Sequence, residues 1–91
     1  MKFVYPAIIK PTEHGYHAYF PDLAMCEADG EDLDEVLRNA RQAMFDWIDL
    51  ELSEEDPDLP YVTDESDMEL PEGAFVRNVM ITYRFHVGWD E

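Results

Sequence analysis

The chain has 91 residues, 46% of them hydrophobic, with 22 Asp or Glu against 6 Lys or Arg and a formal net charge of −16. This length fits one domain with a single core, and the hydrophobic content excludes a disordered chain. The charge excludes nucleic acid and anionic lipid as partners because both would be repelled; it favours a basic partner, or serves only solubility in a salty cell.

The first predicted element is an antiparallel hairpin. Residues 3–10 (FVYPAIIK) are β-branched and aromatic, as strand residues are. Pro6 has no N–H to donate, so we expect this strand at a sheet edge or bulged at that position. Residues 11–15 (PTEHG) have turn chemistry, and residues 16–20 (YHAYF) alternate as a second strand that pairs with the first.

A short third strand and a helix follow. Residues 23–29 predict the strand, which ends at Gly30. Asp32 is a natural helix N-cap, and Glu35 completes a capping box. The positions that recur at helical spacing form one apolar face, which we expect to pack on the sheet as the main source of core energy: Leu33, Val36, Leu37, Ala40, Ala43, Met44, Trp47 and Ile48.

A strongly acidic stretch separates the helix from the last predicted strand. From Glu51 to Glu72 the chain carries ten carboxylates and no Lys or Arg. Residues 53–72 therefore predict a long acidic loop, and loops of this length are usually functional or disordered.

Residues 74–87 predict a long final strand. One of its faces is apolar apart from Arg77, since it carries Phe75, Val79, Ile81, Tyr83, Phe85 and Val87. Because this strand is longer than the hairpin strands, we expect its far end to pair with a second copy of the chain. The predicted fold class is α+β: an antiparallel sheet packed on one helix, in the order strand, strand, strand, helix, strand.

The chain is expected to be a single cytoplasmic domain spanning residues 1–91. Cys26 is the only cysteine and cannot form an internal disulfide, which suits a reducing compartment. No apolar signal region follows Met1 and Lys2, and no stretch approaches the roughly 18 apolar residues of a membrane span.

The motifs of the first half, in this order and spacing, resemble the HicB antitoxin family. They are YPAIIK, then GYHAYFPDL, Cys26, Gly30, and a helix that begins DLDE and continues through Asn39 and Ala40. The resemblance covers Phe3 to about Leu52, whereas the last strand fits less specifically. It implies a partial ribonuclease H-like fold.

Two departures from the family pattern are informative. Ala24 and Met25 stand where the family usually has Pro-Gly, so we expect a gentler bend before Cys26. Many HicB proteins carry a C-terminal DNA-binding module, and none is recognised after the last strand. Autoregulation by operator binding is therefore not expected of this chain.

The resemblance implies an antitoxin that neutralises a HicA-like toxin, a small basic ribonuclease, by covering its active site. Carboxylates would compete with phosphate for the basic groups of the toxin. We expect Tyr19 to be the central aromatic contact, on the sheet face away from the helix, with Asp22, Glu27 and Asp29 around it. The predicted oligomer interface is Tyr83, Phe85, Val87 and Trp89, in a dimer or larger homo-oligomer.

No enzymatic chemistry, cofactor or metal is predicted. Ribonuclease H-like nucleases hold metal with a carboxylate on the first strand, and residues 3–10 contain none. His14, His17 and Asp22 could imitate a metal site, but two exposed hairpin histidines are the simpler interpretation. Cys26 is expected to be a buried thiol whose pKa is raised by Glu27 and Asp29.

The alternatives to an antitoxin are a self-associating acidic adaptor of the same fold without a toxin and, more remotely, a metal-dependent nuclease.

Overall fold

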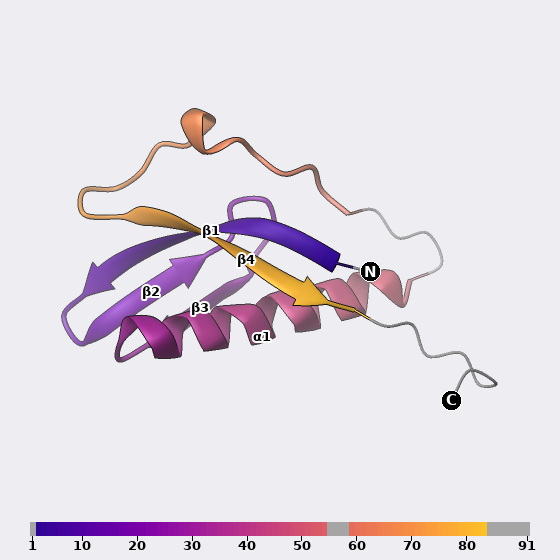
Figure 1. Cartoon of the computed structure of the whole chain (residues 1–91), viewed down its shortest axis with the longest axis horizontal. Coiled ribbons are helices and arrows are strands. Elements are labelled where there is room, and N and C mark those ends of the chain that lie inside the picture. Colours follow the sequence, from indigo (N-terminus) through magenta and orange to yellow (C-terminus); the bar gives the residue numbers. More distant parts are fainter. Residues whose placement is uncertain (1, 55–58, 84–91) are drawn as a thin grey trace.

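The computed structural model has two layers, a four-stranded antiparallel sheet and one long helix packed on it (Figure 1). It describes residues 2–54 and 59–83. The elements in chain order are β1 (Lys2–Thr12), β2 (Gly15–Tyr19), β3 (Glu27–Gly30), α1 (Leu33–Leu52), the 3-10 turn η1 (Glu65–Asp67) and β4 (Phe75–Thr82). The α+β class, with an antiparallel sheet and one helix, is therefore confirmed.

The strand order β3-β2-β1-β4 places β1 inside the sheet, so the expectation that this strand lies at an edge is wrong for the strand as a whole. At Pro6, however, β1 has only β4 beside it, and at Pro11 it has only β2. Ile8 and Ile9 alone have partners on both sides. Each proline therefore lies where β1 has a neighbouring strand on one side only, and the side of the residue that lacks an N–H can face away from the ladder.

The helix has the predicted start and the predicted buried face. The Asp32 carboxylate accepts the N–H of Glu35 at 2.8 Å, as predicted for the N-cap. The Glu35 carboxylate accepts the N–H of Glu31 at 2.8 Å, so the reciprocal bond of the predicted capping box is made to the residue before the N-cap and not to Asp32 itself. All eight residues of the predicted apolar face lie in the core cluster or against it: Leu33, Val36, Leu37, Ala40, Ala43, Met44, Trp47 and Ile48. Within the described residues, no helix combines the length and apolar character needed to cross a membrane.

The third strand is shorter and later than predicted, since it covers Glu27–Gly30 rather than residues 23–29. Residues 21–25 form a turn instead, and the Cys26 N–H donates to the Leu23 carbonyl at 3.1 Å. The expectation of a gentler bend is wrong: Met25 takes a φ of 62°, the left-handed conformation that favours glycine. The sharp turn is therefore retained without the glycine.

Gly30 joins β3 to α1 at a very close approach. A Cβ added to this residue would lie 2.3 Å from the backbone nitrogen of Val36. The strand can therefore run straight into the first turn of the helix only because residue 30 has no side chain.

The acidic stretch begins with the end of α1. In its described part, Leu59 packs against the core cluster, and residues 62–65 line a pocket together with Pro6 and Asn78 of the sheet. The predicted final strand, residues 74–87, is observed as β4 over Phe75–Thr82. Tyr83 follows the strand, and three residues of the predicted oligomer interface (Phe85, Val87 and Trp89) lie outside the described residues.

Candidate protein-binding face of the sheet

The sheet face away from α1, which we call the outer face, carries Tyr19. In β2, Ala18 and Phe20 are 0% and 3% exposed within the core cluster under the helix. Because side chains alternate along a strand, His17 and Tyr19 point to the outer face. Tyr19 therefore lies on the side expected from the sequence, directly opposite Ile8 of β1 and Glu27 of β3.

His17 connects the two carboxylates of β3 with Tyr19. Its Nδ1 lies 2.7 Å from Oδ1 of Asp29, and its Nε2 lies 3.4 Å from Oε1 of Glu27. The His17 and Tyr19 rings are 6.2 Å apart between centroids. We call His17, Tyr19, Glu27 and Asp29 the β2–β3 cluster. The sequence singled out three of its members, whereas His17 was considered only as a metal ligand.

The β2–β3 cluster combines an aromatic ring with accessible negative charge. The side chains of Glu27 and Asp29 are 58% and 81% exposed, and that of His17 is 20% exposed. Two carboxylates held beside a tyrosine can accept charge-assisted hydrogen bonds from Lys or Arg, while the ring supplies apolar contact area. Such a surface is suited to binding a basic protein.

Asp22 does not belong to this cluster, because its carboxylate is occupied elsewhere. It accepts the backbone N–H of Thr63 at 2.8 Å and also the Thr63 hydroxyl. Next to this contact, the Tyr5 hydroxyl donates to the Pro60 carbonyl at 2.6 Å. Burial raises the pKa of Tyr5, and the charge of Asp22 adds to the effect. Asp22 and Tyr5 together fasten the segment after α1 to the sheet, a role that no local motif around Thr63 indicates.

The remaining candidate groups are dispersed. The side chain of His14 is 94% exposed in the hairpin turn. Over residues 2–54 and 59–83, no three His, Cys, Asp or Glu side chains are grouped as metal ligands would be.

Cys26 is buried, and its pKa is raised to about 11, mainly by burial and further by Asp46 and Glu27. Asp46 of α1, which the sequence did not indicate, therefore helps to raise the pKa of Cys26, whereas Asp29, which the sequence did indicate, is not among the causes.

The family model and the solved structures that match this chain point to the same family. Residues 5–81 match a family model described as "HicB_like antitoxin of bacterial toxin-antitoxin system". The chain is similar to one in a "HicA3 and HicB3 toxin-antitoxin complex", with 28% identity, a TM-score of 0.65, and coverage of 84% of this chain and 94% of that chain. It is also similar to the crystal structure of antitoxin HicB3, with 27% identity, a TM-score of 0.70, and coverage of 93% and 72%.

A toxin-antitoxin complex from Streptococcus pneumoniae shares the fold, with a TM-score of 0.71 at 20% identity over 98% of this chain and 83% of that chain. No curated protein matches the chain.

Proposed function

This chain belongs to the HicB-like antitoxin family, and we propose that it binds and neutralises a small basic HicA-like ribonuclease toxin by covering the active site of the toxin. The observation that carries the proposal is the β2–β3 cluster, in which exposed carboxylates surround Tyr19 on the outer face. Inhibition of this kind requires a complementary surface and no chemistry by the inhibitor.

Charge supports a basic partner at this surface. A net charge of −16 on 91 residues attracts a cationic protein over a distance and orients the encounter. At contact, the guanidinium or ammonium groups that would otherwise bind RNA phosphates can bind Glu27 and Asp29 instead. The neutralised toxin would then have lost the groups that hold its substrate.

A nuclease function of the chain itself is not supported. In ribonuclease H-like nucleases, two metal ions clamp the attacking and leaving oxygens and are held by carboxylates on the first strand and the helix. All eleven residues of β1 (KFVYPAIIKPT) lack Asp and Glu. We therefore propose that the chain acts only by binding.

The first experiment measures binding of the purified chain to the product of the neighbouring reading frame, which we expect to be a HicA-like protein. We expect a stable complex, no RNA cleavage by the complex, and recovery of cleavage when the antitoxin is removed. Tyr19→Ala should speed dissociation at least tenfold, because central aromatic anchors contribute about 2 kcal/mol or more to tight interfaces. Tyr61→Ala is the matched control for the loss of a tyrosine ring, since Tyr61 is 96% exposed and is not a member of the β2–β3 cluster.

The second experiment separates the β2–β3 carboxylates from the acidic segment. Glu27→Gln with Asp29→Asn should slow association, whereas Glu69→Gln with Glu72→Gln removes the same charge from the segment before β4 and should slow it less. If the two double variants slowed association equally, the attraction would depend on net charge alone. If the Glu69 and Glu72 variant slowed it more, the binding surface would lie on the acidic segment before β4. Failure of the neighbouring product to bind at all would instead favour an acidic adaptor without a toxin.

A further inference from the structure

His17 lies between the two carboxylates of the β2–β3 cluster. Its Nδ1 is 2.7 Å from Oδ1 of Asp29, and its Nε2 is 3.4 Å from Oε1 of Glu27. An ionised carboxylate can only accept hydrogen bonds, so the shorter contact places the single N–H of a neutral ring on Nδ1. The neutral ring then donates to Asp29 and turns the lone pair of Nε2 toward Glu27. In this state Glu27 receives no hydrogen bond from His17 and is available to a partner.

A second proton on the His17 ring changes this arrangement. The imidazolium carries an N–H on both nitrogens, so it can donate to Asp29 and Glu27 together. The ring and the two carboxylates then carry one net negative charge instead of two. Because the His17 side chain is 20% exposed, against 58% for Glu27 and 81% for Asp29, an approaching protein meets the carboxylates and finds them already occupied from behind.

The other groups that face His17 keep their charge in both states of the ring. Lys10 of β1 is directly opposite His17 and on the same face of the sheet. Tyr19 of β2 places its ring 6.2 Å from the His17 ring. Within residues 2–54 and 59–83, the hydrogen bond and ion pairs of His17 are those with Glu27 and Asp29. Lys10 therefore adds a constant charge and does not alter the direction of the effect.

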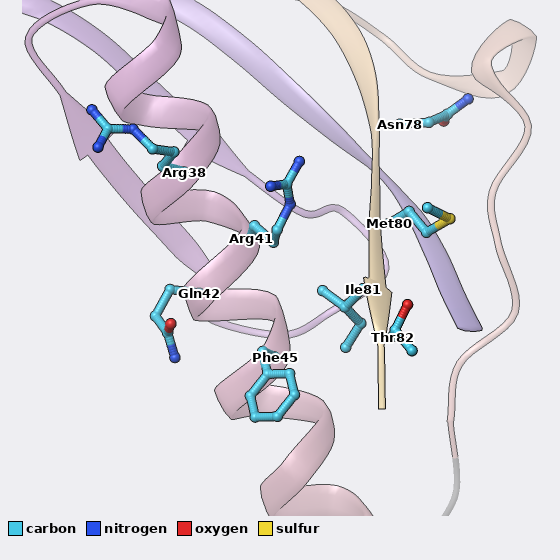
Figure 2. Close-up of a pocket in the computed structure, with 8 residues that line it drawn as sticks. All are labelled: Arg38, Arg41, Gln42, Phe45, Asn78, Met80, Ile81 and Thr82. Atoms are coloured by element: carbon cyan, nitrogen blue, oxygen red, sulfur yellow. The ribbon is translucent and has the colours of Figure 1, made fainter. Parts of the chain in front are cut away.

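The arginines of the described residues lie at the other edge of the sheet. Arg38 and Arg41 line a groove of about 580 Å³ between α1 and β4 (Figure 2), and Arg77 belongs to β4 itself. The strand order β3-β2-β1-β4 puts β4 opposite β3. In the part of the chain that the structure describes, His17 is therefore the group that can add a positive charge directly at the cluster carboxylates.

We propose that His17 sets the charge that the β2–β3 cluster offers to its partner, so that the cluster binds a basic protein when the ring is neutral and releases it when the ring is protonated. This coupling rests on the proposed binding of a basic toxin at the cluster. A guanidinium or ammonium group of the partner and the second proton of His17 compete for the same carboxylates, so each weakens the binding of the other. Histidine ordinarily gains this proton as the pH falls through about 6.5. Binding should therefore weaken between about pH 8 and pH 5.5.

The test measures the dissociation constant of the complex with the product of the neighbouring reading frame at about pH 8 and about pH 5.5. Over this interval the constant should rise at least about fivefold more for the wild-type chain than for His17→Gln, because glutamine donates an N–H and takes up no proton. At pH 8 the two constants should agree within about threefold, since glutamine can replace the neutral ring as a donor to Asp29. A merely structural contribution of His17 would weaken binding at both pH values.

His14→Gln is the matched control, because His14 is 94% exposed in the hairpin turn, and it should behave like the wild-type chain. Circular dichroism checks folding, and His17→Thr, which suits a strand, replaces the glutamine variant if that variant is unfolded. An equal rise for wild type and His17→Gln would overturn the role of His17 and leave toxin binding intact. If no complex forms at pH 8, the proposed function fails instead, and the same comparison with a hexaarginine peptide decides the role of His17.

Discussion

Met25 has a backbone conformation that is unfavourable for a residue with a side chain. It is the one non-glycine residue with positive φ among those the structure describes, and it is 94% exposed. The surrounding turn holds it there through bonds from Phe20 N–H to the Cys26 carbonyl at 3.0 Å and from Trp47 Nε1–H to the Ala24 carbonyl at 2.9 Å. The left-handed conformation costs a residue with a Cβ about 1 to 2 kcal/mol.

Met25→Gly should therefore stabilise the chain. Relief of the steric cost outweighs the greater freedom of glycine in the unfolded state, about 0.4 to 1 kcal/mol, and leaves a net gain of about 0.5 to 1 kcal/mol. Urea denaturation should show a higher midpoint with an unchanged slope. Ala24→Gly, at the neighbouring exposed position, is the control and should lower the midpoint. A lower midpoint for Met25→Gly would mean that the methionine side chain makes a stabilising contact.

Cys26 should be unreactive in the folded chain. Its pKa of about 11, against an ordinary value of 9.0, leaves roughly a hundredfold less thiolate at pH 8, and the thiolate is the reactive form. Alkylation by iodoacetamide at pH 8 should be at least a hundredfold slower in buffer than in denaturant. Because the folded chain holds this proton to a higher pH than the unfolded chain, stability should also fall as pH rises from about 9 to 11. Equal alkylation rates in both states would contradict the buried, protonated thiol.

Among the elements, α1 was the most predictable from the sequence because its signals are local and agree with one another. Asp32 and Glu35 fix its start, and residues three and four apart define one buried face. The interior position of β1 was not predictable in the same way. Pro6 argues against an inner strand. An inner strand can accept this proline only because β2 does not extend to Pro6, and where β2 and β4 end along β1 depends on the pairing of three segments.

The β2–β3 cluster was partly predictable and the position of Asp22 was not. Strand alternation places Tyr19 on the outer face, and the pairing of β2 with β3 brings Glu27 and Asp29 beside His17. Asp22, in contrast, bonds to a residue 41 positions away in a segment without regular structure. Contacts of that kind leave no periodicity in the sequence, so a carboxylate that fastens a segment is indistinguishable there from one that binds a partner.

The segment around Thr63 should come loose when Asp22 is removed. Asp22→Ala deletes the acceptor of the Thr63 N–H and hydroxyl, and hydrogen bonds to charged groups contribute about 1.5 to 3 kcal/mol. The Thr63 amide should exchange at least tenfold faster, while the amides that join β1 to β2 should stay protected. Asp67→Ala, in η1 of the same segment, is the control with an equal loss of charge. An unchanged Thr63 amide would show that other contacts hold the segment.

At the scale of the whole molecule, the charge is unevenly distributed over the surface. The β3 edge and the outer face beside it carry exposed carboxylates, whereas three arginines lie at the opposite edge, Arg77 on β4 and Arg38 and Arg41 on the neighbouring part of α1. Both edges nevertheless belong to a chain with a net charge of −16. A basic partner is attracted by the net charge of the whole molecule. Association with such a partner should therefore be sensitive to salt.

Raising the salt concentration from 50 to 500 mM shortens the range of charge interactions from about 14 Å to about 4 Å. The association rate with a HicA-like toxin should fall at least tenfold, because screening removes the long-range attraction. Stopped-flow mixing at each salt concentration measures this rate. If the association rate did not change with salt, the net charge of this chain would have no part in attracting its partner.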